Sequence, residues 1–322
     1  MSSIKLDKLS ATLGDFCREN TDVLISELVM DPKLDQRFAV LDDIKDEYPL
    51  PFLTVSDELV KPGNDRKFEP VENAIEFDAR ILKVRDCKVD LQIFPADFEK
   101  VWLGKYKKQG SRGQDIPFEQ FIFQVIILKA RRAMLNKALY RGVYNAAGST
   151  TATTMDGYLK LIADEIAADN IVPVVTGAIT QANCVDALIS VYDALGEEYK
   201  EEGVQQKVNS TIFDWVYRKT NPLINNTLVA TQDLANGQAK KVNFMALPGT
   251  NCTLVRETGL GTSQRVITCQ KENMSYGVDS TGDDANIEVQ RDKRALNLLI
   301  DFKAGVNFNE IHKNALAVND QL

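Results

Sequence analysis

The stretch IPFEQFIFQVIILKARRAMLNKALYRGVYN, residues 116–145, decides how the rest of the chain is interpreted. Asp115 precedes it at an N-cap position, Pro117 fits a first helical turn, and no further glycine or proline occurs before Gly142. Its apolar residues recur at helical spacing, at Phe121, Val125, Leu128, Leu135 and Leu139. The pattern predicts one helix over about 116–145, which at 1.5 Å per residue is about 45 Å long and far exceeds the usual three turns.

The same helix carries a row of basic residues on its polar side, namely Lys129, Arg131, Arg132, Lys137 and Arg141. Such a row is either a solvated face or a surface that contacts nucleic acid or the carboxylates of a neighbouring subunit. Both interpretations stay open, and the second makes four of these residues candidate interface residues: Lys129, Arg132, Lys137 and Arg141.

Upstream of the helix, residues 77–93 alternate between apolar and polar side chains, and only Lys83 and Arg85 break the alternation. This pattern predicts one long strand, or two strands around a bend near 83–86. Residues 48–70 contain four prolines, which favour an extended segment without regular packing. The two segments could form a long two-stranded arm. Its charged candidate interface residues are Lys61, Asp65, Arg66 and Lys67.

The remaining segments predict shorter elements, so that the whole chain is α+β. Residues 1–47 predict short amphipathic helices, interrupted at Gly14 and at Asp31-Pro32, that lie on another surface rather than form a core. Further helices are predicted at 95–106, 156–168, 181–195 and 210–219. Short strands are predicted at 226–231, 240–246, 252–257, 265–270, 273–276 and 286–290. A last strand at 295–308 is almost continuously apolar, as expected of a central strand.

Composition excludes several classes of function. The net charge of −8 argues against a dedicated nucleic-acid-binding surface. The five cysteines form no CxxC pair, so we expect buried thiols in a reducing cytoplasm rather than disulfides or zinc ligands. We also expect no signal peptide and no membrane partner, because no apolar run approaches the roughly 20 residues that span a bilayer.

No group of residues predicts catalysis. The one histidine, His312, has no organised partners, and the turn around Gly259 and Gly261 lacks the lysine and the helix of a phosphate loop. Acidic pairs such as Glu197-Glu198 and Asp283-Asp284 fit no calcium loop and are typical of solvated surface. We therefore expect no catalytic site, no cofactor and no bound metal, and protruding elements without chemistry favour an assembly protein.

The order of these elements resembles the major capsid fold of tailed bacteriophages, the Hong Kong 97 type. In that family an N-terminal arm precedes an extended hairpin called the E-loop, a long spine helix in the peripheral (P) domain, and an axial (A) domain. Two segments are similar in detail: RVITCQKENMSYGVD at 265–279, and the closing strands at 286–308, which contain Phe302-Lys303-Ala304-Gly305-Val306. The resemblance covers nearly the whole chain.

The resemblance implies a division of the chain into five parts. These are an N-terminal arm at 1–47, the E-loop and its strands at 48–93, the P domain with the spine helix at 94–148, the A domain at 149–282, and a return to the P domain at 283–322. The lysine–asparagine crosslinks of some relatives do not carry over, because neither residue can be aligned here.

The resemblance also implies a function. We expect a non-enzymatic subunit of an icosahedral phage or prophage head, made in the bacterial cytoplasm and located in the virion. It would assemble into hexamers and pentamers around double-stranded DNA without binding a specific sequence. A portal, a separate scaffolding protein and a decoration protein are the further expected partners.

Two other functions stay open at this point. The first is the shell subunit of an encapsulin-like compartment, which has the same fold and encloses a cargo protein. The second, more remote, is an unrecognised α+β enzyme, which would depend on carboxylates because histidine is nearly absent.

Overall fold

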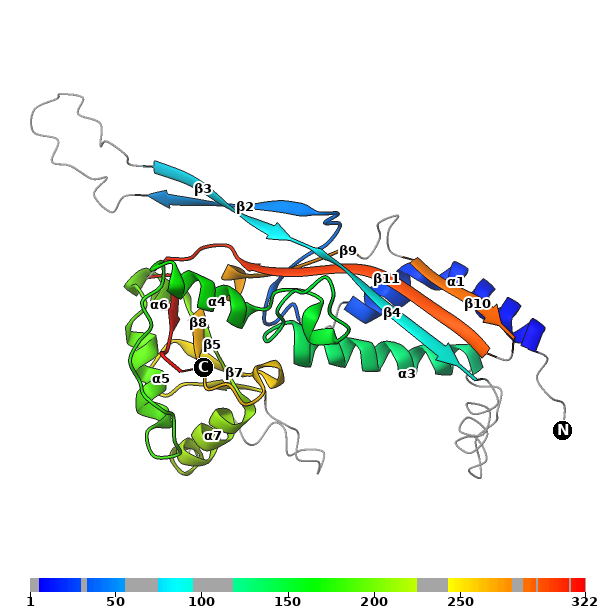
Figure 1. Ribbon diagram of the computed structural model, residues 1–322. Coiled ribbons are helices and arrows are strands. Elements are labelled where there is room, and N and C mark those ends of the chain that lie inside the picture. Colours follow the sequence, from blue (N-terminus) through cyan, green and yellow to red (C-terminus); the bar gives the residue numbers. More distant parts are fainter. Residues whose placement is uncertain are drawn as a thin grey trace, which may run out of the picture.

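The computed structural model describes residues 6–29, 34–55, 75–94, 118–224, 243–279, 286–293, 295–312 and 314–321. It shows an elongated half and a rounder half, each built on its own five-stranded sheet (Figure 1). A two-stranded ribbon projects from the elongated half. The chain therefore has the predicted α+β character, and its two sheets divide it into two packing units.

The ribbon consists of β2 (Glu47–Val55) and β3 (Ile75–Lys83), paired antiparallel from Glu47 opposite Lys83 to Val55 opposite Ile75. β4 (Arg85–Ile93) follows after the single residue Val84. The predicted arm is confirmed over 47–55 and 75–83, although β2 is a regular strand where the prolines predicted irregular packing, and residues 56–74 lie outside the described residues. Of the two alternatives for 77–93, the bend near 83–86 is the one found.

The first sheet has the order β1-β9-β11-β10, and β4 also pairs with β11. Its strands are β1 (Ala39–Leu41), β4, β9 (Met274–Asp279), β10 (Asn286–Asp292) and β11 (Ala295–Phe308). β11 is the long central strand that its apolar sequence predicts. It pairs antiparallel with β4, β10 and β9, so one strand holds the elongated half together.

The N-terminal segment forms α1 (Leu6–Val29), which consists of two helical stretches joined at Asn20, so the predicted short helices are confirmed but the break lies at Asn20 rather than at Gly14. It kinks at Asn20 but passes Gly14 without a break. A glycine inside a helix costs only about 1 kcal/mol relative to alanine, which burial readily offsets. The buried side of α1 packs against β10, β11 and the long helix α3, so α1 does lie on another surface, that of its own subunit.

The long helix is shorter than predicted. α3 spans Phe118–Ala133 and continues as a π-helical turn, Met134–Ala138, instead of reaching residue 145. The backbone beyond it bonds to a later segment: Val143 N–H donates to Ala152 O at 2.9 Å, and Gly157 N–H donates to Gly142 O at 2.9 Å. These bonds replace the helical ones and end the helix.

The second sheet has the order β12-β8-β5-β7-β6 and builds the rounder half. Its strands are β5 (Val204–Val208), β6 (Phe244–Ala246), β7 (Cys252–Arg256), β8 (Ile267–Cys269) and β12 (Leu316–Val318). Its helices are α5 (Cys184–Asp193), α6 (Glu197–Glu202) and α7 (Ser210–Ile224), whereas α4 (Tyr158–Ala167) packs against β11 of the first sheet. The predicted helices at 156–168, 181–195 and 210–219 correspond to α4, α5 and α7, whereas β5 and α6 were not predicted. The strand predicted at 226–231 and the helix predicted at 95–106 lie outside the described residues.

The expected division at residue 282 does not coincide with the division into two sheets, because one strand on each side of 282 pairs in the other half. β9 belongs to the 149–282 segment but pairs in the first sheet with β11. β12 belongs to the 283–322 segment but pairs in the second sheet with β8. Each half therefore contains strands from distant parts of the sequence.

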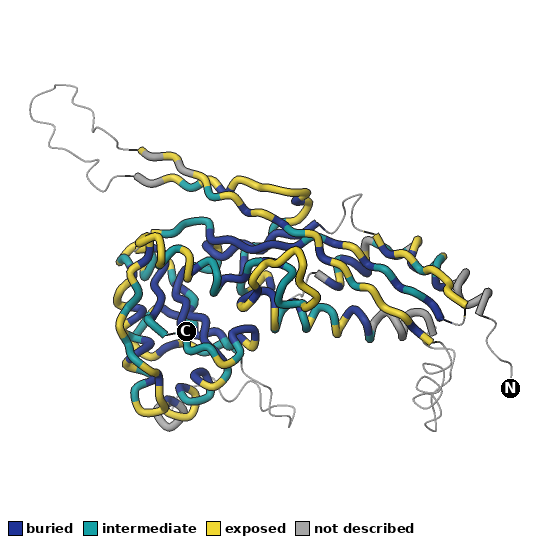
Figure 2. Tube along the Cα trace, viewed as in Figure 1, coloured by how far each residue is buried: buried dark blue, intermediate teal, exposed yellow. Residues whose placement is uncertain are grey.

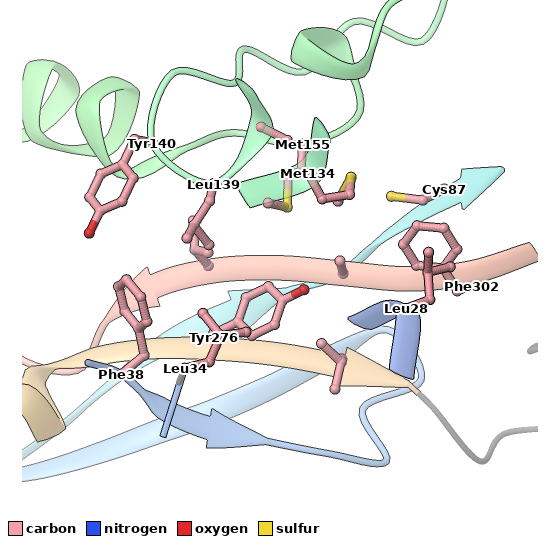
Figure 3. Packing of buried hydrophobic residues seen from close by; sticks show 14 of the residues in the cluster. Leu28, Leu34, Phe38, Cys87, Met134, Leu139, Tyr140, Met155, Tyr276 and Phe302 are labelled. Carbon is pink, nitrogen blue, oxygen red and sulfur yellow. The ribbon is translucent and has the colours of Figure 1, made fainter. Parts of the chain in front are cut away.

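Four aromatic residues form a cluster within the core, and Figure 3 shows two of them, Phe38 and Tyr140, among their buried neighbours. The rings of Phe38 and Tyr158 stack with centroids 5.6 Å apart, and Tyr140 and Phe308 pack against Tyr158. The Tyr158 hydroxyl, which is buried, donates to the carbonyl of Ser275 at 2.8 Å. This cluster fixes the end of the long helix against β9 and β11.

Candidate assembly surfaces

Alternate residues of the ribbon face the rest of the subunit. Leu50 and Leu82 are buried with Ile44 and Val84. Leu82 lies so close to Gly277 of β9 that a Cβ atom at 277 would meet its Cδ2 at 2.5 Å. These contacts clamp the base of the ribbon onto the first sheet.

The opposite face, here called the outer face of the ribbon, is apolar and points away from the subunit. Phe77 is 83% exposed, Ile81 57% and Leu53 51%. Figure 2 shows the ribbon as largely exposed, in contrast to the sheets behind it. The same face carries Pro49, Pro51, Ile75 and Ala79. Single exposed apolar side chains are ordinary, but a continuous row on a projecting ribbon marks an interaction surface.

Two prolines limit how a partner can bind the ribbon. Pro49 pairs with Ile81 and Pro51 with Ala79. Because proline has no backbone N–H, β2 cannot offer a continuous row of donors to an added strand. A partner at this edge therefore contacts the side chains of the outer face rather than extending the ribbon by another strand.

The four candidate interface residues on the long helix are exposed: Lys129, Arg132, Lys137 and Arg141. Arg141 folds back, and its Nη2 donates to Asn136 O at 2.7 Å. Arg131, also in the basic row, instead contacts its own chain: its Nη1 donates to Glu27 O of α1 at 3.1 Å. The other predicted interface residues, Lys61, Asp65, Arg66 and Lys67, lie outside the described residues.

A groove of about 1110 Å³ runs beside β4, between that strand and the loop 144–154 after the long helix. Buried Met134 and Phe302 contribute to its lining, and Asp86, Asp90 and Asp301 also line it. Sites for small molecules are mostly apolar, with few convergent polar groups. This groove is open and nearly half of its lining is polar, which does not favour a substrate site.

Buried charges join the two halves. Lys207 of β5 is fully buried, and its Nζ donates to Met274 Sδ at 3.0 Å and lies 4.9 Å from the ring centroid of Phe38. Burial lowers the pKa of Lys207. Burial raises the pKa of the Glu257 carboxyl, and Arg37, whose Nη1 donates to Glu257 Oε2 at 3.1 Å, opposes that shift. The sequence pattern indicated none of these residues.

No arrangement suited to catalysis is found in the part of the chain that the structure describes. It contains no group of three or more His, Cys, Asp or Glu residues that could hold a metal ion. All five cysteines are buried, and burial raises the pKa of Cys17, Cys87 and Cys252 to about 12, which makes them poor nucleophiles. None of the described helices is long and apolar enough to cross a membrane.

Comparison of the sequence with known proteins finds no matching family model and no matching curated protein. Comparison of the structure finds many matches. One is the satellite phage P4 procapsid, with a TM-score of 0.59 and 12% identity over 99% of this chain and 91% of the other. Another is the capsid of an empty GTA particle, with a TM-score of 0.50 and 12% identity over 95% and 97% of the two chains. The SrpI encapsulin of Synechococcus elongatus also matches, at a TM-score of 0.47 and 11% identity over 91% and 88%.

The P4 procapsid match spans both halves and the ribbon, because it covers 99% of this chain. At 12% identity the likeness is one of backbone architecture rather than of sequence. The chain has the fold of the tailed-phage major capsid subunits, the Hong Kong 97 type.

Proposed function

We propose that the chain is a structural subunit of an icosahedral phage head, which assembles into hexamers and pentamers that enclose double-stranded DNA. Its capsid fold supports this. The observation that carries the proposal is the outer face of the ribbon, which is apolar and turned away from its own subunit. Exposing such a row to water is unfavourable unless a partner covers it.

The partner is a second copy of the same chain. A head-to-tail contact between two different surfaces closes into a ring when the rotation between copies permits. The ribbon of one subunit would lie over the long helix of the next, beside the exposed basic row, and the rounder halves would meet at the axis of the ring. The acidic net charge suits a wall that confines DNA without holding it tightly.

The free energies of burial and of association explain why many contacts between subunits are needed. Covering the exposed parts of Phe77, Ile81 and Leu53 would contribute roughly 3–6 kcal/mol, at about 1.5–3 kcal/mol for a whole buried side chain. Association costs about 4–15 kcal/mol in lost freedom. One ribbon contact alone is therefore marginal, and stability comes from the number of contacts in a closed shell.

The first test is to express the full chain and examine it by size-exclusion chromatography and negative-stain electron microscopy. Closed shells or rings are expected, with a separate scaffolding protein added if the chain alone stays monomeric. Shells that contain DNA would favour a phage head, and shells that contain one defined protein would favour an encapsulin-like compartment. A chain that stays monomeric at high concentration, with and without a scaffold, would contradict both.

A second test addresses the ribbon. Deleting residues 52–68 should leave a folded monomer that does not assemble. The paired substitution Phe77→Ser and Ile81→Ser should have the same effect without shortening the ribbon. Val23→Ser is the matched control, because Val23 is also exposed and apolar but lies on α1. Normal shells from the ribbon variants would overturn the assignment of the outer face.

A further inference from the structure

An ion pair joins the ribbon to α4, the helix that packs against β11. Arg80 of β3 lies on the inner face of the ribbon, and its Nη2 donates to Oε1 of Glu165 on α4 at 2.6 Å. The other oxygen, Oε2, accepts a hydrogen bond from Asn170 Nδ2, also at 2.6 Å. The side chains of Arg80 and Glu165 are only 24% and 15% exposed, so the pair is shielded from salt better than a surface pair is.

The pair lies close to the base of the ribbon, so a small change of angle at the pair displaces the outer end of β3 by a larger distance. The clamp at Leu82 holds the base of the ribbon, and Arg80 lies two residues farther out on the same face. At about 3.3 Å per residue, Ile75 lies about 17 Å beyond Arg80, so a tilt of about 10° there would move it by about 3 Å. A shift of that size is enough to spoil packing between side chains.

The pair contributes little net free energy to stability, because both of its charged groups are largely removed from water. Arg80 Nε is buried and donates to no acceptor among the described residues. Bringing a guanidinium and a carboxylate out of water has a desolvation cost that can equal the attraction between them. An apolar contact would hold the ribbon as firmly, but with less control of its direction than a charge-assisted bond with fixed geometry.

We propose that Arg80, Glu165 and Asn170 form a latch that fixes the direction of the ribbon before a neighbouring subunit binds. A ribbon held in its docking direction loses less conformational freedom on association and presents its outer face at a single angle. The consequence for assembly rests on the proposed function, whereas the direction of the ribbon is a property of the single chain.

The first experiment measures that direction in the full-length monomer. Spin labels at Ile75→Cys on the ribbon and Asp193→Cys on α5 report one distance, and the native cysteines are buried and react slowly. Arg80→Gln should broaden the distance distribution. Lys83→Gln is the matched control, because Lys83 pairs with Glu47 within the ribbon, and it should leave the distribution unchanged. An unchanged distribution in Arg80→Gln would refute the latch.

The second experiment exchanges the charges. Arg80→Glu and Glu165→Arg should each broaden the distribution, and the double variant should narrow it again, because the pair reforms with opposite polarity. In assembly assays the single variants should give slower assembly and shells of more than one diameter, with recovery in the double variant. Single variants that assemble as the wild type does would limit the latch to the free chain and overturn its role in assembly. If the wild-type chain forms no shell either with or without a scaffolding protein, the proposed function fails, while the distance measurement still decides whether the latch exists.

Discussion

At the scale of single residues, Gly305 shows how tightly the base of the ribbon is built. A Cβ atom at this position of β11 would collide with the carbonyl oxygen of Lys83 and lie 3.0 Å from Val84 Cα. These are backbone atoms at the bend between β3 and β4, and they cannot move aside as a side chain can. Gly305→Ala should therefore lower the free energy of unfolding by about 1–3 kcal/mol, measured by urea denaturation.

Gly14→Ala is the control for this measurement. Gly14 lies inside α1, and nothing lies within 4 Å of a Cβ atom there. Alanine reduces the freedom of the unfolded chain and suits a helix, so this variant should gain up to about 1 kcal/mol. Equal stability of Gly305→Ala and the wild type would mean that the bend is not packed as described.

The burial of Lys207 predicts how the free energy of unfolding depends on pH. Burial lowers its pKa from 10.5, so between the folded and unfolded pKa values the unfolded chain binds a proton that the folded chain does not. The stability contributed at this residue therefore rises with pH up to about 10.5 and is lost as the pH falls. Lys207→Met removes that dependence and should be at least as stable as the wild type at pH 7.

The comparison is made by urea denaturation of both proteins from pH 7 to 10. The free energy of unfolding of the wild type, relative to Lys207→Met, should increase along this range. Because all other groups are shared, the difference isolates Lys207. A relative decrease with rising pH would show that the lysine is held as a stabilised cation.

At the scale of elements, the local spacing of apolar residues predicted the helices and strands that have one apolar face or a continuous apolar run. The helices α4, α5 and α7, the bend between β3 and β4, and the long strand β11 follow from the spacing of apolar residues. β5, with the sequence VQQKV, has no such pattern, because polar residues are buried in it and bond to distant partners. Gln206 Nε2, for example, donates to Leu188 O and to Thr268 Oγ1.

The candidate surfaces were predicted in part, for a similar reason. Alternation in 77–93 identified the apolar face of β3, but alternation does not say what covers a face. In most sheets the core covers the apolar face. In the ribbon the core instead covers Leu82 on the opposite face of β3, and the apolar face with Phe77 stays exposed. The ion pair between Arg80 and Glu165 joins positions 85 residues apart and leaves no trace in local sequence.

The C-terminal strand β12 makes a prediction at this scale. Leu316 and Val318 are buried and pair with β8, and Asn319 accepts from Val266 N–H at 2.8 Å and donates to Gln264 O at 3.0 Å. Removing residues 315–322 should therefore expose the edge of β8 and unfold the rounder half, giving rapid trypsin cleavage and a weak near-ultraviolet circular dichroism signal. Removing only 321–322 is the control and should leave both unchanged. A protease-resistant truncated chain would contradict this role of β12.

At the scale of the whole molecule, the two halves are interlocked by strands exchanged along the sequence and by the buried charges between them. The subunit is therefore expected to behave as one body with two separate candidate contact surfaces, the outer face of the ribbon and the basic row of the long helix. If these surfaces meet head to tail, each subunit uses its ribbon on one neighbour and its helix on the other. The arrangement can be tested by mixing two variants, each defective in one surface.

The ribbon variant carries Phe77→Ser and Ile81→Ser, and the helix variant carries Lys129→Glu, Arg132→Glu and Lys137→Glu. Neither should assemble alone. In an equimolar mixture the intact ribbon of the helix variant can bind the intact helix of the ribbon variant, but the opposite pair of surfaces is broken on both sides. Native mass spectrometry should therefore show pairs with one copy of each variant and no closed rings. Because a single contact of this kind is marginal, the mixture is examined at the highest protein concentration that the measurement allows. Closed rings in the mixture would mean that the ribbon and the basic row do not form one interface, because a head-to-tail contact between them permits only the pair.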